Sequence, residues 1–523
     1  MTRIARHLLL GLGLGGGVTA LGTYWLLAQE KPFEPPIFKG RPGVIAPPGA
    51  GKAEPPPPPP SGPGFGVPTP AIEIPGRPAT YSPAGAESKP DKSVPPVKVT
   101  DQVAKTAFAV EPKPLSEAVK KGLKYLVEHQ QPDGGWNQGG GWRTNLSGGG
   151  RIDGPNVADP SDVGNTAFAM LALIRAGNTP VEGEYKDAVR KGLEFLLKHV
   201  EKADNDSLYV SDIRGTQLQS KIGPYVDTFM ANLVLAELRG RCGNLEPRVV
   251  TALEKTMTKI VRHQGADGNF AGNNAWAPTL SVGIANKSVA RARERGAQVD
   301  EIVLKRIVAQ AKTAAQSAGR TGGVTSTAVP GVEGPGRPGG ARTIPAAAGD
   351  AGIALYSASQ GASNFQDVVN NIRLDAAKAK EVLKSRSATT EQKREAERKL
   401  AELRQLEEQN AALQAELLRN ARDQRFVAGF GSNGGEEFLS YLNISETLVL
   451  QGGKEWEEWD ARMTRGLEAA QDRDGSWQGH HCITGRTFCT AAALLVLMAD
   501  RTPFPVEVIA AAREKKNAAP ADK

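Results

Sequence analysis

The chain has 523 residues, of which 40% are hydrophobic and 23% charged, as in an ordinary soluble globular protein with one large domain or several average ones. The net charge of +7 is small for this length, and the basic residues are not clustered in one stripe, so no nucleic-acid partner is expected. Cys242, Cys482 and Cys489 exclude a disulfide framework, because three cysteines allow at most one intramolecular bridge.

Residues 1–30 have the pattern of a signal peptide or membrane anchor. Two arginines precede an apolar stretch at 8–28, and a basic segment followed by an apolar core is typical of export signals. Val18–Ala20 is a small-x-small site for signal peptidase, yet the uncut stretch is long enough to span a bilayer. We expect export, either to the periplasm or as a membrane-anchored protein facing outside the cytoplasm. The sequence is consistent both with removal of this segment by signal peptidase and with its retention.

Residues 31–114 are rich in Pro, Gly and Ala and contain six consecutive prolines at 55–60. Such a segment buries too little apolar surface to offset the conformational entropy that folding removes. We expect a disordered, semi-extended spacer that holds a folded domain away from a membrane, with a membrane tether at the N-terminus. Docking of the prolines to a proline-binding module is the weaker alternative.

From residue 115 the chain repeats an amphipathic helix. Residues 117–130 place apolar side chains on one face at helical spacing, and similar stretches occur at 188–199, 252–263 and 462–470. Three of these four stretches are followed by turns of one kind, with the sequences QQPDGGW, QGADGNF and QDRDGSW.

A second, almost wholly apolar helix type alternates with the first. Clear examples are 164–177, 226–240 and 485–500. An apolar helix must be covered on most sides, so we expect these helices in an inner layer with the amphipathic helices outside. The sequence then predicts six outer–inner pairs: 115–131 with 162–177, 184–199 with 224–239, 246–263 with 276–294, 300–317 with 349–361, 366–424 with 436–451, and 455–471 with 484–499.

Two turns carry a recognisable motif: K-G-x-x-Y-L-x-x-x-Q with D-G-G-W at 121–136, and R-G-x-x-x-x-Q with D-G-S-W at 465–477. They resemble the QW motif of the squalene-cyclase and prenyltransferase repeat family. The resemblance implies an all-α fold, an α/α toroid over residues 115–505, in which the glutamine caps the outer helix and the tryptophan packs between repeats. The matching residues are Gln130 or Gln131 with Trp136, and Gln471 with Trp477.

Two insertions interrupt the expected toroid. Residues 319–349 are a Gly/Pro/Ala-rich segment that we expect to be a flexible loop. Residues 366–424 contain no glycine or proline and carry leucines at heptad spacing, with Thr389 or Thr390 as the expected N-cap of a second helix. We expect a projecting, coiled-coil-like helical hairpin, with one long solvated helix as the alternative, and a C-terminal tail at 506–523.

One segment lines up with D-x-D-D-T-A, the acid motif of the class II terpene cyclases. Asp162–Ala167 has the sequence D-V-G-N-T-A, so Gly164 stands where that motif has its proton-donating aspartate. Because glycine cannot act as a general acid, cyclase activity is not expected. Asp162 and His481 stay candidates for a catalytic role, and whether the chain is an enzyme is left open, with a non-catalytic function favoured.

A metal-like cluster follows the last QW-like turn. His480, His481 and Cys482 are consecutive, and Cys489 lies within the next helix. Imidazole and thiolate groups form tetrahedral zinc sites, but neighbouring histidines do not easily bind one ion and no fourth ligand is evident. We therefore expect no cofactor, with zinc as the alternative.

Two functions are consistent with these patterns. The first is a non-catalytic exported protein that binds a lipid or isoprenoid, a peptide or a partner protein through its cavity or its helical hairpin. The second is an exported enzyme of the terpene cyclase and prenyltransferase superfamily that acts on a lipid, with zinc as a candidate cofactor. The missing cyclase acid favours the first, because a shared fold does not by itself carry the chemistry.

Overall fold

The computed structural model describes residues 89–142, 151–152, 158–320, 353–427 and 434–518. The expected export segment at 1–30, the spacer up to residue 88 and all but the first two residues of the expected loop at 319–349 lie outside these ranges. Within the described part of the chain, no helix is both long enough and apolar enough to cross a bilayer.

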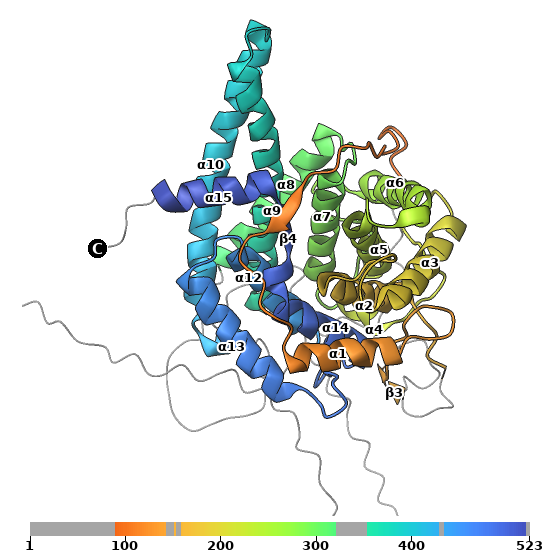
Figure 1. Cartoon of the computed structure of the whole chain (residues 1–523). Helices are drawn as coiled ribbons and strands as arrows, with labels where there is room; N and C mark the ends of the chain where they lie inside the picture. Colours follow the sequence, from red (N-terminus) through yellow and green to blue (C-terminus); the bar gives the residue numbers. More distant parts are fainter. Residues whose placement is uncertain (1–88, 143–150, 153–157, 321–352, 428–433, 519–523) are drawn as a thin grey trace, which may run out of the picture. The chain divides into compact units, whose positions relative to one another are not determined.

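The described chain is predominantly helical, as the sequence predicts. Its strands are short and form two antiparallel pairs, β1 (Thr106–Phe108) with β4 (Pro503–Pro505) and β2 (Gly141–Trp142) with β3 (Arg151–Ile152). The first pair joins the two ends of the helical region, since β1 precedes the first helix and β4 follows the last turn of the repeats (Figure 1).

The amphipathic helices occur where the apolar periodicity predicts them. They are α1 (Glu117–Glu128), α3 (Lys186–Lys202), α6 (Glu246–His263), α8 (Glu301–Arg320) and α13 (Lys454–Ala470). The first of them begins where Ser116 caps it, since the Ser116 side chain accepts a hydrogen bond from Val119 N at 3.3 Å.

The second helix type is buried along most of its length. These helices are α2 (Val163–Arg175), α5 (Val226–Leu238), α7 (Pro278–Glu294), α9 (Ala354–Lys384), α12 (Glu437–Val449) and α14 (Arg486–Leu497), with α9 buried in its first half. They contact one another in a closed series, from α2 through α5, α7, α9, α12 and α14 back to α2. The amphipathic helices pack on the outside of this series, as α3 does on α2 and α13 on α12 and α14 (Figure 1).

The two QW-like turns make the same hydrogen bonds. Trp136 is wholly buried, and its Nε1 donates to Leu126 O at 2.6 Å, while Gln130 Nε2 donates to Gly134 O at 2.7 Å and to Ala188 O at 2.9 Å. Of the two glutamines that the sequence leaves open, Gln130 therefore joins the end of α1 to the start of α3.

In the second turn, Trp477 Nε1 donates to Leu467 O at 2.8 Å. Gln471 Nε2 donates to Gly475 O at 2.9 Å and to Ala118 O at 2.8 Å. Gln471 thus joins the last amphipathic helix, α13, to the first, α1.

Both turns require glycine after the aspartate. Gly134 and Gly475 have φ angles of +89° and +88°, which favour glycine. A Cβ atom on Gly134 would lie 2.6 Å from Lys191 O, and one on Gly475 would lie 2.7 Å from Lys121 O. Each turn is therefore packed directly on the backbone of the next amphipathic helix.

Helix α9 departs from the predicted boundaries. It runs without a break through residues 361–366, so the fourth buried helix and the start of the predicted insertion at 366–424 form one helix. Its lone glycine there does not end it, because residues 355–371 are buried on all sides and the surrounding helices hold the backbone. After a break at 385–389, α10 (Thr390–Ala421) begins with a capping box between Thr389 and Gln392, and it packs along α9 (Figure 1).

Residues 89–114 were expected to belong to the spacer, but they lie against the helical region. Val94 and Val97 are buried, and Asp91 N donates to Arg262 O at 2.8 Å. The folded part therefore includes residues 89–114 as well as the chain from residue 115, because these valines are buried against α6 and its neighbours.

The expected C-terminal tail at 506–523 is helical as far as residue 518. Helix α15 (Val506–Ala518) follows β4 and packs on α9, with Val508 and Ile509 buried. The apolar V-x-V-I start of the segment explains why it packs rather than extending into solvent. The remaining described helices are short: α4 (Gln217–Ile222), α11 (Gln424–Val427) and two single turns of 3-10 helix at Gly243–Leu245 and Ala499–Arg501.

Candidate functional site

Charged side chains occupy the space between the buried helices. Lys287 Nζ of α7 lies 2.8 Å from Glu446 Oε2 of α12, and Arg175 of α2 reaches the other Glu446 oxygen at 3.4 Å. Arg291 Nε pairs with Glu237 Oε1 of α5 at 3.6 Å. Burial alone would raise the pKa of Glu446, but Lys287, Arg175 and Arg291 lower it to about 2.

This network leaves little room at the centre. The cavity bounded by α2, α5, α7, α9 and α12 has a volume of about 30 Å³, roughly the space of one or two water molecules. Within the described residues, the centre of the closed series therefore offers no cavity for an isoprenoid or another lipid.

The candidate catalytic residue Asp162 caps a helix. Its wholly buried side chain accepts a hydrogen bond from Asn165 N at 2.8 Å at the start of α2, and Asn165 Nδ2 lies within 3.1 Å of both carboxylate oxygens. A Cβ atom on Gly164 would lie 2.8 Å from Asp227 Oδ1, so a side chain there would collide with α5. The carboxylate of Asp162 thus has a structural task that explains its burial.

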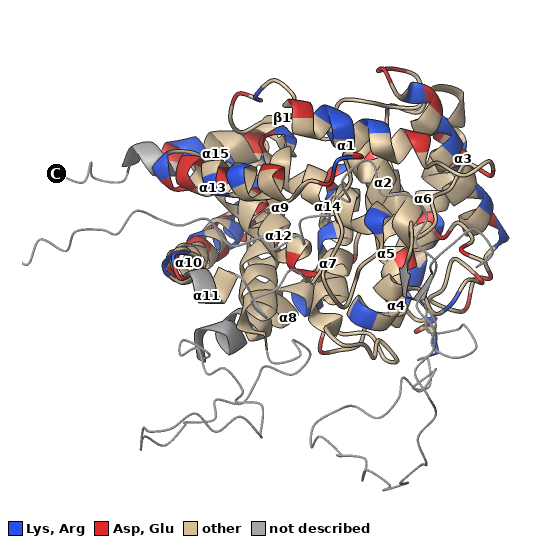
Figure 2. Cartoon of the chain, turned by 90° about the horizontal axis from the view of Figure 1, so that it is seen from below, with Lys and Arg blue, Asp and Glu red and all other residues tan. Residues whose placement is uncertain are grey.

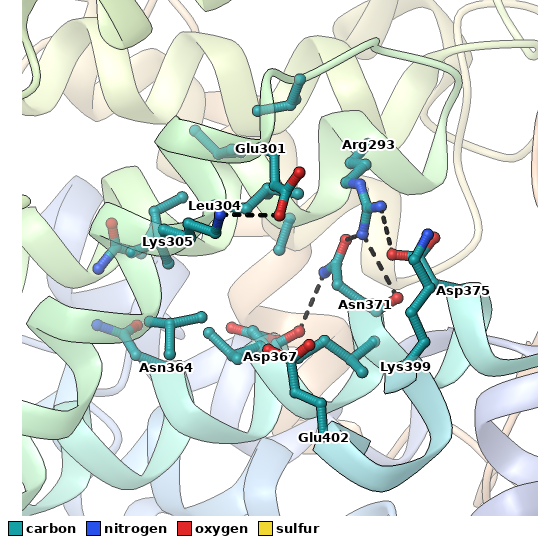
Figure 3. Close-up of a pocket in the computed structure, with 18 of the residues that line it drawn as sticks. Arg293, Glu301, Leu304, Lys305, Asn364, Asp367, Asn371, Asp375, Lys399 and Glu402 are labelled. Atoms are coloured by element: carbon teal, nitrogen blue, oxygen red, sulfur yellow. Dashed lines mark hydrogen bonds and ion pairs between the residues drawn. The ribbon is translucent and has the colours of Figure 1, made fainter. Parts of the chain in front are cut away.

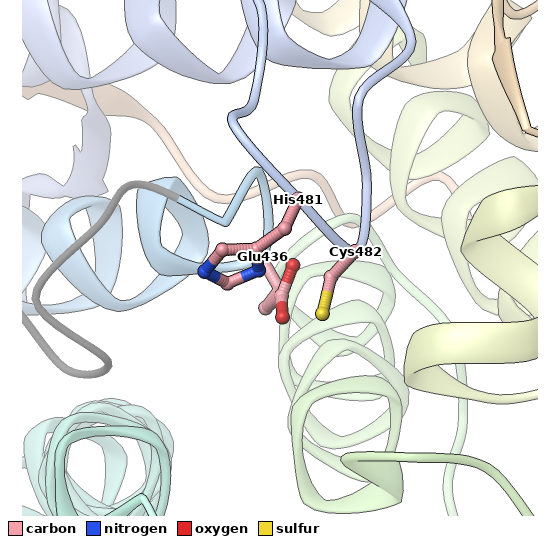
Figure 4. A group of neighbouring side chains, drawn as sticks. All are labelled: Glu436, His481 and Cys482. Carbon is pink, nitrogen blue, oxygen red and sulfur yellow. The ribbon is translucent and has the colours of Figure 1, made fainter. Parts of the chain in front are cut away.

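Three potential metal ligands converge at one end of the buried helices (Figure 4). Glu436 directly precedes α12, while His481 and Cys482 lie in the loop before α14. One ligand atom from each residue lies within 4.8 Å of the others. Glu436 is wholly buried, whereas His481 and Cys482 are partly exposed.

The other two predicted metal ligands lie outside this group. His480 is exposed, and its ring is perpendicular to that of His481 at 5.9 Å. Cys489 is wholly buried in α14, and its Sγ lies 3.6 Å from Ile483 O. Cys489 therefore packs in the core beside the group, and all three cysteines of the chain are free thiols.

Tightly packed glycines bring the ligand residues together. Gly434 pairs with His481 in a short parallel bridge, and a Cβ atom on Gly434 would lie 2.9 Å from both His481 Cε1 and Glu436 Oε2. Gly435 N donates to Ile483 O at 3.0 Å. The G-G-E sequence thus allows the carboxylate and the imidazole to approach each other.

The loop that carries His481 and Cys482 is held from α4. Gln217 Oε1 accepts hydrogen bonds from Thr484 N and Gly485 N, both at 2.9 Å. Gln217 N in turn donates to Gln138 Oε1 at 2.7 Å. These bonds fix the loop against two segments distant in sequence.

Glu436 was missed by the sequence reasoning, since one glutamate before an apolar helix carries no distinctive spacing. The available signal was its position: the G-G-E-E sequence puts two acidic residues and two glycines at the start of a helix that is otherwise apolar. A buried helix with acids at its first residues requires a partner for them.

A groove lies on another part of the molecule, between α8 and α10 (Figure 3). Both helices pack on α9 and contact each other little, so a space of about 550 Å³ stays open between them. Leu304, Val308 and Ile372 are partly exposed apolar residues that line it.

Charges of both signs line the groove. Lys305 pairs with Glu301 at 2.9 Å within α8, whereas Lys399 and Glu402 of α10 form no ion pair with another described residue. Figure 2 shows the same mixture of cationic and anionic residues along α10 and α13. The lining thus combines partly exposed apolar side chains with polar and charged ones, of which Lys399 and Glu402 form no ion pair with another described residue.

No known family model matches the sequence, and no curated protein matches it either.

Proposed function

We propose that residues 89–518 form an α/α toroid similar to those of the squalene-cyclase and prenyltransferase repeat family. The closed series of six buried helices supports this, because a toroid requires its last inner helix to contact its first. The matching bonds of Gln130 and Gln471 support it further, since each joins one amphipathic helix to the next. In this arrangement α10 and the second half of α9 form the hairpin that the insertion at 366–424 adds to the toroid.

We further propose that this toroid is exported, is held at a membrane by its N-terminal segment, and binds a partner protein without catalysing a reaction. The groove between α8 and α10 is the observation that carries this function. It is the larger space, at about 550 Å³ against about 30 Å³ at the centre. Its lining comes from α7, α8 and the two helices of the hairpin, so the insertion at 366–424 supplies one side of the groove.

The occupant that fits this groove is one amphipathic helix of the partner. A helix laid between α8 and α10 would place its apolar stripe on Leu304, Val308 and Ile372. Residues beside that stripe would pair with Lys399 and Glu402, so the partner needs an acidic and a basic residue flanking its apolar face. Exposed ion pairs such as Glu301–Lys305 contribute less than about 1 kcal/mol and exchange easily for pairs with a ligand.

The test is selection of helical peptides from a displayed library on the immobilised full chain, followed by affinity measurements on two tryptophan variants. Ala290→Trp fills the groove, because Ala290 lines it. Ala309→Trp places the same side chain on the exposed face of α8, outside the groove. Both variants are checked for unchanged thermal unfolding.

We expect Ala290→Trp to weaken binding of the selected peptides at least about tenfold, equivalent to about 1.4 kcal/mol, and Ala309→Trp to leave it unchanged. Peptides that bind both variants equally, or a library that yields no binder, would contradict a function based on this groove.

A further inference from the structure

We propose that Glu436, His481 and Cys482 bind a divalent transition-metal ion of the zinc type. They offer a carboxylate oxygen, an imidazole nitrogen and a sulfur, all of which zinc accepts. Their ligand atoms lie within 4.8 Å of one another. Ligands of a tetrahedral zinc ion lie about 3.3–3.8 Å apart, given metal–ligand distances of about 2.0–2.3 Å. Small side-chain rotations would bring the three atoms onto one ion.

The burial of the Glu436 carboxylate is a second argument for a metal cation beside it. Its side chain is wholly buried, and no described lysine or arginine forms an ion pair with it. Its Oε2 is reached by Ile483 N at 3.4 Å, and the Tyr356 hydroxyl and the Cys482 thiol also lie beside the carboxylate, but no described lysine or arginine does and Oε1 makes no hydrogen bond of normal geometry. An ionised carboxylate buried in this way is strongly destabilising unless a cation or several donors compensate it. A metal ion held by His481 and Cys482 would supply that compensation.

The backbone of Cys482 provides a separate argument. Its φ angle is +57°, and among the described residues it is the one non-glycine residue with a positive φ. That conformation is unfavourable for a residue with a Cβ atom and persists where the surroundings impose it. Here the hydrogen bonds that Thr484 N and Gly485 N donate to Gln217 Oε1 hold the loop, and Cys482 carries its thiol toward Glu436 (Figure 4).

Metal binding would change the protonation of the site. Burial and the nearby charge of Glu436 raise the pKa of Cys482 to about 12, so the metal-free residue is a thiol at neutral pH. Binding of the ion would release this proton to solvent and leave a metal–thiolate bond. Three protein ligands also leave one position of a tetrahedral ion open, and the partial exposure of His481 and Cys482 lets water or another small ligand complete it.

Cobalt(II) titration of the full chain, stripped of metal with chelator and kept reduced, tests this site. Cobalt(II) substitutes for zinc, and a cobalt–thiolate bond produces a charge-transfer absorption in the near ultraviolet. We expect this absorption to saturate at one equivalent of cobalt(II). Zinc should then abolish it by displacing the cobalt.

Neighbouring residues of the same type provide matched controls. Cys482→Ser should abolish the absorption while Cys489→Ser retains it, and His481→Ala should weaken cobalt(II) binding at least tenfold while His480→Ala does not. Glu436→Gln should weaken binding yet raise the melting temperature of the metal-free protein, because it removes a buried charge. A purely structural role of Glu436 predicts a lower melting temperature instead.

Three results would overturn the proposal: no thiolate absorption in the wild-type protein, absorption that survives in Cys482→Ser, or equal effects of the two histidine substitutions. Because His481 and Cys482 are partly exposed loop residues, their variants are expected to fold, and far-ultraviolet circular dichroism checks this. The cobalt(II) titration does not depend on the groove between α8 and α10. Metal binding and helix binding can therefore be disproved separately.

Discussion

Gln130 and Gln471 each join three segments of chain through one side-chain amide. In both cases the amide nitrogen donates to the turn that follows its own helix and to the first residues of the next amphipathic helix. A neighbouring glutamine, Gln131, instead donates to His129 O at 3.0 Å at the surface. Gln130 and Gln131 are adjacent glutamines, but only Gln130 joins α1 to α3.

This difference predicts that alanine at position 130 lowers the free energy of unfolding more than alanine at position 131. Gln130→Ala removes the side-chain donor shared by the carbonyls of Gly134 and Ala188, so we expect it to lower the free energy of unfolding by about 1–3 kcal/mol. Gln131→Ala should change it by less than about 0.5 kcal/mol, as is usual for surface substitutions. Urea-induced unfolding measures both, and equal effects would show that the turn is not joined to α3 in this way.

The central network predicts a loss of stability in acid. The pKa of Glu446 is lowered to about 2 in the folded protein, below its unfolded value of about 4.3. The stabilisation is therefore present above about pH 4.3 and is lost as the pH falls toward 2; a shift of this size corresponds to roughly 3 kcal/mol. Glu294 acts in the opposite direction, because burial raises its pKa.

Groups from each surrounding helix face this carboxylate, namely Arg175, Glu237, Lys287, Arg291 and Asp367. Glu446→Gln should destabilise the protein at pH 7 by about 3–5 kcal/mol, since it leaves buried cations uncompensated, and should flatten the acid dependence. Glu457→Gln, at an exposed position on α13, is the control. An unchanged pH profile in Glu446→Gln would mean that the carboxylate is not ionised in the folded state.

Helices α7 and α9 show how closely the buried elements approach. Gly283 of α7 faces Gln360 of α9, and a Cβ atom on Gly283 would lie 1.7 Å from Gln360 Cδ. Gln360 in turn accepts a hydrogen bond from Asn443 Nδ2 of α12 at 3.0 Å. One glycine therefore sets the spacing at which three consecutive buried helices meet.

Gly283→Ala should destabilise the protein by about 1–3 kcal/mol through overpacking. Gln360→Ala removes the atoms that the new methyl group would meet. The double variant should therefore lose less free energy of unfolding than the two single variants lose together. A double-mutant cycle of unfolding free energies measures this coupling. Strict additivity would show that α7 and α9 do not pack through this pair.

Local patterns explain which elements the sequence predicts. Apolar periodicity and the D-G turns locate the amphipathic helices, and Thr389 marks the start of α10, because these signals depend on neighbouring residues. The continuity of α9, the packing of residues 89–114 and the place of Glu436 were not predicted. Each depends on segments distant in sequence, such as Ile483 beside Glu436.

At the scale of the whole molecule, the two ends of the helical region are tied together. The β1–β4 pair, the bond from Gln471 to Ala118 and the contact of α14 with α2 all join early residues to late ones. Residues 89–114 add to this, since Lys113 N donates to Asp500 Oδ2 at 2.8 Å. Residues 89–114 thus help to connect the two ends of the helical region.

Truncation should reveal this contribution. A protein that begins at residue 89 should keep the melting temperature of the full chain, whereas one that begins at residue 115 should unfold at a lower temperature, because it loses β1 and the buried Val94 and Val97. Differential scanning calorimetry compares the two. Equal melting temperatures would mean that residues 89–114 only rest on the surface.

Hydrogen–deuterium exchange with a selected peptide tests most directly whether the groove between α8 and α10 binds a helix of a partner protein, as we propose. We expect the peptide to slow exchange in α8 and in the part of α10 around residues 395–405, while α3 and α6 exchange as before. Protection that appears on other helices while α8 and α10 stay unchanged would contradict the claim.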